Sequence, residues 1–327
     1  MKLLKLIPDN TNIKFLRWRV PFYVVSLLLM AASVGLVVTQ GLNLGVDFVG
    51  GQSIRVTFTE TAEAPIAEVR EEIDALGYGE PIIQQVGAPN RIDIRMRLPD
   101  GEGAGVVEQM VREVRGTVQE NHADARIDGV EAVSGKVSDE LFRTGMMALA
   151  LAMVGISIYI WMRFEWQFGF GALFALAHDV TLTLGMFALT QLEFDLNIVA
   201  ALLTLIGYSL NDNIVIYDRI RENLKKFRKM PLPELLDLSV NETLSRTVVT
   251  TVSLLITLLA LLLLGPDVIF GFTAAITMGI FVGTYSSIFM STPILIWLGV
   301  TSDSFVPIES RADAQVRKAR GQPEAEA

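Results

Sequence analysis

Two aspartates and an arginine fall in or at the edge of apolar stretches of this 327-residue chain. Asp179 lies in the middle of one stretch, Asp212 lies near the end of the next, and Arg246 opens the following one. A carboxyl group in a low-dielectric environment binds a proton readily, whereas a nearby arginine, which stays protonated, favours the ionised form. If Arg246 approaches and withdraws, Asp212 can release and take up a proton. The pattern therefore predicts a proton pathway through Asp212, Arg246 and Asp179.

Polar residues accompany these groups. The candidate supporting residues are His178, Ser209, Asn211, Asn213 and Thr247. The cluster around Asp212 indicates a hydrated cavity or a polar helix contact rather than exposure to lipid. Other interpretations stay open: Asp212 and Arg246 can form a static ion pair, Asp179 can bond only to a neighbouring helix, and His178 can be a packing residue.

Composition limits other chemistry. The chain has no cysteine and only two histidines, so we expect no disulfide, no metal centre and no cysteine nucleophile. It has no glycine-rich phosphate loop with a lysine, and Ser209 lies in no Gly-x-Ser-x-Gly pattern. The residues before Asp212 are Tyr-Ser-Leu-Asn, which differ from the Gly-x-Gly-Asp signature of intramembrane aspartyl proteases. We therefore expect no enzyme activity and no cofactor, with protons as the coupling ion.

The apolar stretches are long enough to cross a membrane. The chain is 51% hydrophobic with mean hydropathy +0.44, and a membrane crossing needs roughly 20 apolar residues. We predict an α-helical polytopic membrane protein with spans at 20–39, 144–162, 166–190, 196–217 and 247–266. A sixth, tilted span of about 25 residues lies within 268–302 and ends near Pro293.

Basic residues predict the orientation of these spans. The segment 218–246 carries seven Lys or Arg, whereas the turns 191–195 and 265–267 carry none. Because short basic segments stay inside, we expect both termini of this multi-pass protein in the cytoplasm.

The segment between the first two spans has the pattern of an extracytoplasmic α+β domain. Strands are predicted at 52–60, 81–86, 91–97 and 126–133, with helices at 65–76 and 105–121. The order β-α-β-β-α-β is that of a ferredoxin-like fold. An excess of acidic residues here argues against binding to nucleic acid.

The chain thus divides into consecutive parts. They are a cytoplasmic segment 1–19, the first span 20–39, the periplasmic ferredoxin-like domain 40–139, a five-helix bundle 140–302 with cytoplasmic loop 218–246, and a disordered cytoplasmic tail 303–327. Within that loop, residues 232–244 predict an amphipathic helix on the membrane surface.

Several strings closely resemble the SecF branch of the SecD/SecF family, in the resistance-nodulation-division superfamily. They are LGVDFVGG at 44–51, RFEW at 163–166, AHD at 177–179, IGYSLNDN at 206–213, DRIREN at 218–223, RT at 246–247 and GFT at 271–273. Their order within six spans makes the resemblance specific.

The resemblance implies a protein of the bacterial cytoplasmic (inner) membrane. It further implies half of a resistance-nodulation-division unit that forms a heterodimer with SecD. It implies association with the SecYEG channel, with YajC as a further candidate, and use of the proton-motive force to promote translocation and release of exported preproteins. Asp212 and Arg246 match the family's proton-pathway residues. Gly45, Asp47, Gly50 and Gly51 form a structural motif after the first span.

Two departures and two alternatives accompany this expectation. The family often has Ser where this chain has Asn213, and Leu254 replaces one hydroxyl of the fifth span, so the partners of the proton site are less defined than the site. The alternatives are a proton-driven half-transporter for small molecules or lipids, and a non-transporting membrane scaffold.

Overall fold

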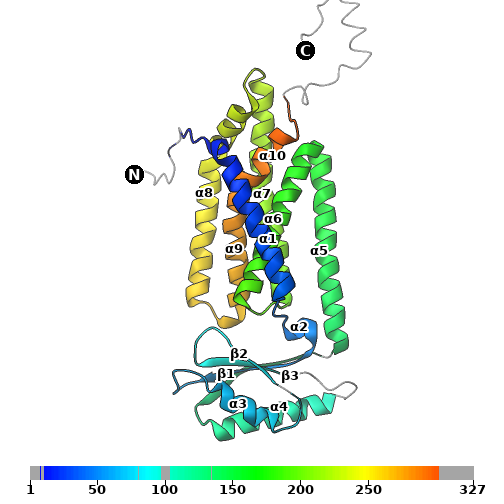
Figure 1. The fold of residues 1–327 in the computed structure, drawn as a ribbon, viewed down its shortest axis with the longest axis vertical. Helices are drawn as coiled ribbons and strands as arrows, with labels where there is room; N and C mark the ends of the chain where they lie inside the picture. The colour runs from blue at the N-terminus through cyan, green and yellow to red at the C-terminus, as the bar shows by residue number, and fades with distance from the viewer. Residues whose placement is uncertain (1–7, 9–10, 80, 97–103, 134, 302–327) are drawn as a thin grey trace, which may run out of the picture.

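The computed structural model describes residues 8, 11–79, 81–96, 104–133 and 135–301. The predicted disordered tail 303–327 and most of the first ten residues lie outside this part of the chain. A bundle of long helices makes up most of the molecule, and a small domain of sheet and helices lies at one end (Figure 1).

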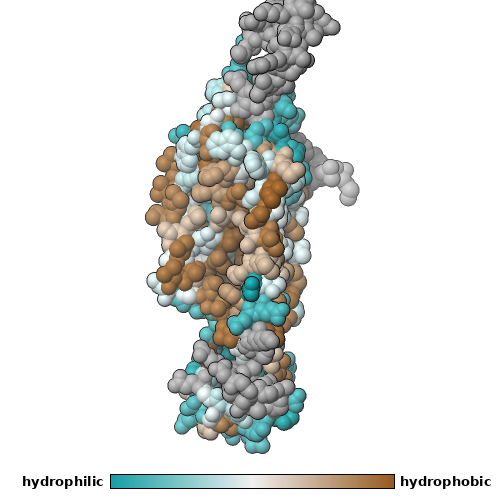
Figure 2. Space-filling view, turned by 90° about the vertical axis from the view of Figure 1, so that its right-hand side faces the viewer, coloured by the Kyte–Doolittle hydropathy of each residue, from teal (hydrophilic) through white to brown (hydrophobic). Residues whose placement is uncertain are grey.

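Within the described residues, six helical segments are long and apolar enough to cross a membrane. The first five are α1 (Arg19–Thr39, preceded by a 3-10 turn at Phe15–Trp18), α5 (Gly135–Arg163), α6 (Trp166–Thr190), α7 (Leu196–Lys226) and α8 (Leu232–Leu264). The sixth follows the 3-10 turn Asp267–Ile269 and joins α9 (Phe270–Ser286), a π-helical turn (Ser287–Ser291) and α10 (Thr292–Trp297). Figure 2 shows a broad apolar band over the bundle with hydrophilic residues toward its ends. The prediction of six spans is confirmed.

The cytoplasmic loop expected at 218–246 is instead a helical hairpin. Residues 232–244, predicted to be a separate helix on the membrane surface, are the first turns of the continuous helix α8. Their apolar stripe, including Leu235 and Leu236, packs in one buried cluster with Ile220 and Leu224 of α7. Because α7 extends beside it, this stripe is buried against protein and has no need of a membrane surface.

The last span continues past Pro293 to Trp297 instead of ending near the proline. Proline cannot donate a backbone hydrogen bond, and the helix widens into a π-helical turn just before it. The hydroxyls of Ser291 and Thr292 donate to the Ser287 carbonyl, at 3.0 and 2.8 Å. These side chains satisfy a backbone group within the altered turn and let the span continue.

The small domain is a ferredoxin-like fold. Its elements are β1 (Gly51–Phe58), α3 (Ile66–Asp74), β2 (Ile82–Gln85), β3 (Arg91–Met96), α4 (Ala104–Asn121) and β4 (Ala125–Val133). The strands pair antiparallel in the order β2-β3-β1-β4. This order and the sequence of elements confirm the predicted topology.

The two faces of the sheet differ. Alternate residues such as Ile54 and Ile94 are fully buried in one core with residues of α3 and α4. The intervening residues of β1 and β3, including Ser53, Asp93 and Arg95, are polar and nevertheless buried. The sheet lies between the domain's own helices and the bundle (Figure 1), so this polar face is turned toward the membrane helices.

Helices α1 and α6 approach closely at a glycine. A Cβ atom added at Gly185 would lie 2.9 Å from the Cα atom of Ser33, inside any normal contact distance. Small residues at such points let two backbones pack together within a membrane.

We predict that Gly185→Ala destabilises the bundle by about 1–3 kcal/mol, because the added methyl group must push α1 away from α6. Gly155→Ala is the matched control, since Gly155 of α5 is exposed and has no heavy atom within 4 Å of the added Cβ. Thermal unfolding in detergent measures the difference. Equal melting temperatures for the two variants would contradict the close contact.

Candidate functional site

Asp179 is the most completely surrounded carboxyl group in the described bundle. It is fully buried on α6, and one oxygen lies 2.9 Å from Nδ1 of His178. The other oxygen accepts hydrogen bonds from Ser209 of α7 at 2.5 Å and Ser286 of α9 at 2.9 Å. Three helices thus meet at one side chain, and their donors compensate its removal from water.

Two glycines make this meeting possible. A Cβ at Gly283 of α9 would lie 3.3 Å from Cβ of Ser209 and 3.5 Å from the Asp179 carboxylate. A Cβ at Gly279, one turn away, would overlap Leu205 of α7. The Gly-x-x-x-Gly pattern therefore brings α9 against α7 at the level of Asp179.

Asp212 is buried but only half satisfied. One carboxyl oxygen accepts a hydrogen bond from the Thr247 hydroxyl of α8 at 3.2 Å. The other is buried and has no hydrogen-bond partner within the described part of the chain. Arg246 is exposed beside Thr247 and acts on Asp212 electrostatically, but these two side chains form no ion pair within 4.0 Å among the described residues. The structure thus brings Asp212, Thr247 and Arg246 together, and Asp212 bonds to Thr247 but forms no ion pair with Arg246 in the described part of the chain.

The neighbours of Asp212 point to different sides of α7. Asn213 is buried, donates to the Ser209 carbonyl at 3.0 Å, and accepts a short hydrogen bond from Ser291 in the π-helical turn. Asn211 is exposed on the outer face of α7. Neither amide side chain contacts the Asp212 carboxylate, so the expected polar cluster is divided between the bundle interior and its surface.

The two aspartates occupy different depths. Ser209, which donates to Asp179, precedes Asp212 by three residues on α7, an axial rise of roughly 4.5 Å. Asp179 therefore lies further from the hairpin end of the bundle, in the direction expected from the sequence. His178 belongs to the Asp179 cluster, and its buried Nε2 has no hydrogen-bond partner among the described residues.

The glycine motif lies outside the bundle, in the connection from α1 to β1. The Gly45 N–H donates to the Phe194 carbonyl at 2.9 Å, and the Phe194 N–H donates to the Asn43 carbonyl at 2.8 Å, on the turn between α6 and α7. Asp47, in the short helix α2 (Val46–Val49), accepts a hydrogen bond from the Leu196 N–H at 3.0 Å and so helps to cap α7. Gly50 and Gly51 have φ angles of 72° and 125°, which favour glycine, where the chain turns into β1. The motif therefore fixes the sheet to the end of α7.

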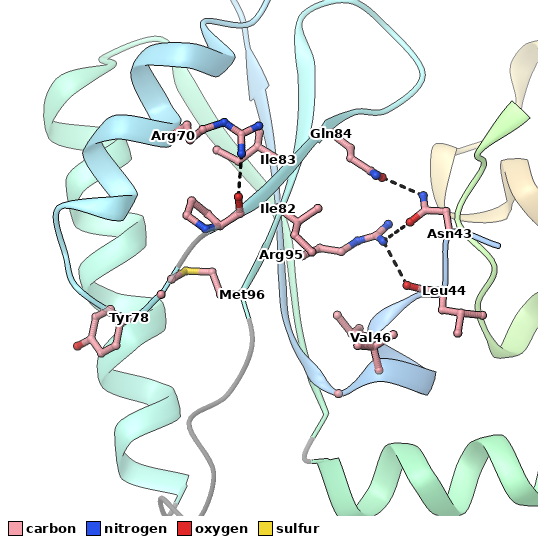
Figure 3. Close-up of a pocket in the computed structure, with 14 residues that line it drawn as sticks. Asn43, Leu44, Val46, Arg70, Tyr78, Ile82, Ile83, Gln84, Arg95 and Met96 are labelled. Carbon is pink, nitrogen blue, oxygen red and sulfur yellow. Dashed lines mark hydrogen bonds between the residues drawn. The ribbon is translucent and has the colours of Figure 1, made fainter. Parts of the chain in front are cut away.

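Arg95 completes this junction, as Figure 3 shows. Its guanidinium donates to Asp93 at 2.7 Å and to the Asn43 side chain at 2.8 Å, and it lies 3.2 Å from the Glu193 carboxylate. Asn43 also donates to Gln84 of β2 and to the Gln191 carbonyl, both at 2.8 Å. One arginine and one asparagine thus connect sheet, linker and membrane helices.

Glu193 and Asp195 occupy the turn itself, outside the spanning helices. Burial raises the pKa of Glu193 to about 7, an effect that Arg95 opposes and that Asp93 and Asp195 reinforce. Burial also raises the pKa of Asp195, although the N–H of Ile198 and the Asn197 amide favour its ionised form. A cluster of carboxyl groups with shifted proton affinity therefore lies at the junction.

The sequence did not identify every member of these sites. Ser286 and Ser291 lie in the last span, far in sequence from their partners, and no local pattern indicates those contacts. The sequence does contain features that could have indicated Arg95 and Glu193. Asp93 and Arg95 are charged residues at alternating positions in a predicted strand, and Glu193 is an acid in a turn free of bases.

We predict that Ser286→Ala destabilises the bundle by about 1–3 kcal/mol, because a buried carboxyl group loses one of its donors. Thr257→Val on the exposed face of α8 is the control, since among the described residues that hydroxyl bonds only to the Ser253 carbonyl of its own helix. Thermal unfolding in detergent should show a lower midpoint for the first variant alone. An unchanged midpoint would show that the Asp179 cluster contributes little to packing.

Two family descriptions match this chain. "Protein export membrane protein SecD/SecF, C-terminal" matches residues 113–301, and the "SecD/SecF GG Motif" matches residues 35–62, which include the Gly45–Gly51 connection.

Full-length relatives and solved structures agree with these matches. The protein translocase subunit SecF of Cereibacter sphaeroides is 46% identical over 303 residues, covering 91% of this chain and 93% of the relative. SecF of Vibrio alginolyticus is 38% identical over 306 residues, covering 93% and 96%. The crystal structure of SecDF from Thermus thermophilus, a translocon-associated membrane protein, superposes with a TM-score of 0.80 at 34% identity. The match covers 90% of this chain but only 39% of that longer chain.

Proposed function

Because this chain belongs to the SecD/SecF family of protein-export membrane proteins, we propose that it couples proton movement to polypeptide export. Its role lies in Sec-dependent protein transport, as one subunit of the translocase. The coupling ion is the proton, the pathway runs through Asp212, Arg246 and Asp179, and the chain has neither a cofactor nor an enzyme activity of its own.

The half-satisfied carboxyl group of Asp212 carries the proton proposal. A buried oxygen without a donor is costly, whereas a proton or an approaching guanidinium would satisfy it. Arg246 is close enough to act electrostatically and is not bound in an ion pair within 4.0 Å among the described residues. Each charge that crosses the membrane supplies about 2.3 kcal/mol per 100 mV, enough to bias a conformational equilibrium.

Asp179 has a different part in the proposal. Its carboxylate already has two hydroxyl donors and an imidazole. It is therefore the fixed end of the pathway, and Asp212 is the end whose partners can change. Asn213 connects this region to the π-helical turn through Ser291, so a rearrangement at Asp212 has a direct route to the last span.

The partner surface follows from exposed polar residues at membrane depth. Along α7, one face of small or polar residues is exposed, namely Asn197, Ala200, Thr204, Gly207 and Asn211. Along α8, a second exposed face contains Arg246, Thr250, Ser253 and Thr257. The exposed face of α5 is apolar by contrast, including Leu151, Val154 and Ile158. Small and polar side chains favour contacts between helices in a membrane. These exposed faces of α7 and α8 therefore bind the SecD subunit.

The wider assembly and the orientation belong to the same proposal. Exported preproteins, the SecYEG channel and YajC are the expected partners beyond SecD. The exposed lysines and arginines at 225–229 lie at the tip of the α7–α8 hairpin, at the end of the bundle opposite the sheet. The positive-inside rule then gives a cytoplasmic hairpin, cytoplasmic termini and an extracytoplasmic sheet domain in the inner membrane.

Our first prediction for this function is that Asp212→Asn abolishes proton-driven export. Secretion of a reporter preprotein, in cells whose only copy is the variant, should fall to the level of cells lacking the chain. Asp218→Asn is the control on the same helix, because Asp218 forms a surface ion pair with Arg163. Normal secretion at normal abundance would leave Asp212 as a structural residue of a scaffold.

The second prediction concerns the partner surface. Gly207→Leu should weaken association with the SecD subunit by about 1–3 kcal/mol, because a large side chain separates two closely packed helices. Gly155→Leu is matched, since an added Cβ meets no atom within 4 Å at either exposed glycine. Co-purification measures the loss, and equal recovery of SecD with both variants would exclude this face of α7.

A further inference from the structure

Negative charge accumulates where the sheet meets the bundle. Asp47 of α2, Asp93 of β3, and Glu193 and Asp195 of the turn between α6 and α7 lie in this junction. Around Glu193 itself, the interacting groups are Asp93 and Asp195, which repel its charge, and Arg95 and Arg55, which attract it. Asp47 acts in turn on Asp195.

Both arginines also form ion pairs with other carboxylates. Arg95 is closer to Asp93, at 2.7 Å, than to Glu193, at 3.2 Å. Arg55 forms its own ion pair with Glu131 at 2.7 Å. An ionised Glu193 is therefore half-buried beside two carboxylates and shares cations that are already paired, which is an unfavourable arrangement.

We propose that Glu193 is a proton-binding site outside the membrane bundle, and that a proton bound there tightens the docking of the sheet onto the α6–α7 turn. The carboxyl group is held in place because Gly45 has no side chain: a Cβ there would lie 2.8 Å from Oε1 of Glu193. Neutralising this group removes the cost of desolvating its charge and the repulsion from Asp93 and Asp195, which together exceed the attraction to Arg95 that is lost, while the backbone bonds of Gly45 and Phe194 remain.

The direction of the effect follows from linkage. Docking raises the pKa of Glu193 to about 7, from an ordinary value of 4.5 for a glutamate in water. The docked state therefore holds a proton that the undocked state releases, so docking is strongest in acid and weakens as pH rises through about 7. Between pH 6 and pH 8 the docking equilibrium should change about tenfold. Asp195, whose pKa is also raised, acts in the same direction.

Solvent can reach this junction from one side. A cavity of about 710 Å³ lies between the connection to β1 and strand β2, and Asn43, Gln84 and Arg95 are among its lining residues (Figure 3). The Glu193 side chain is itself 23% exposed, so its carboxyl group can exchange protons with the medium without passing through the helices. This site is separate from Asp212, which lies inside the bundle near the middle of α7.

The absence of cysteine from the chain gives a direct test. Ser53 of β1 is only 1% exposed on the sheet face that is turned toward the bundle, so a Ser53→Cys thiol should react with a water-soluble maleimide only when the sheet lifts. Thr59→Cys, at an exposed position after β1, corrects for the intrinsic effect of pH on thiol reactivity. For the full chain in lipid nanodiscs, the corrected protection of Ser53→Cys should be about tenfold greater at pH 6 than at pH 8.

A second variant identifies the group responsible. Glu193→Gln, a neutral side chain of the same shape, should keep the thiol protected at both pH values. Glu108→Gln removes an exposed carboxylate of α4 that pairs with Arg112 and should leave the tenfold change intact. Equal protection at pH 6 and pH 8 in the Ser53→Cys background, or an unchanged pH effect in Glu193→Gln, would overturn the proposal. Because the readout is accessibility, the result does not depend on whether Asp212 drives export.

Discussion

A carboxyl group buried between apolar helices has to receive its hydrogen bonds from those helices, and this requirement organises the bundle. Asp179 meets it by drawing α6, α7 and α9 together through Ser209 and Ser286. Gly283 gives the space for that approach. Asp212, one turn further along α7 from Ser209, has only Thr247 as a described donor. One aspartate therefore holds the helices in place, and the other retains an unfilled interaction.

Local patterns were sufficient for the architecture. Apolar length predicted the spans, and alternation and turn residues predicted a ferredoxin-like domain, because both depend on neighbours along the chain. The pairing of Asp212 with the start of the fifth span was also accessible, since both lie at the same end of adjacent helices. The polar side chains near Asp212 were predicted as one cluster, yet Asn211 faces outward and Asn213 turns to the π-helical turn. Sequence spacing alone did not separate these faces.

Long-range packing accounts for what was missed. The stripe at 232–244 has the pattern of a surface helix, and only the extension of α7 beside it shows why it is buried. Pro293 is a usual place for a helix to end, but Ser291 and Thr292 supply hydroxyls that let the span continue. The junction of Arg95 with Glu193 joins residues almost a hundred positions apart. The burial of 232–244 and the contact of Arg95 with Glu193 do not follow from a residue and its close neighbours, whereas the continuation past Pro293 depends on hydroxyls within the same turn.

Helix α7 has a mechanical consequence. It is continuous over 31 residues, roughly 46 Å, with no proline or π-helical turn to absorb bending. Asp47 of α2 and Asp195 accept hydrogen bonds from its first turn, and its last turns form the hairpin with α8. Such a helix behaves as a lever: a tilt of about 5° around its middle would displace each end by roughly 2 Å, in opposite directions. A change in the contacts of Asp212 that tilts α7 would therefore move the sheet junction and the α7–α8 hairpin at the same time, at opposite surfaces of the membrane.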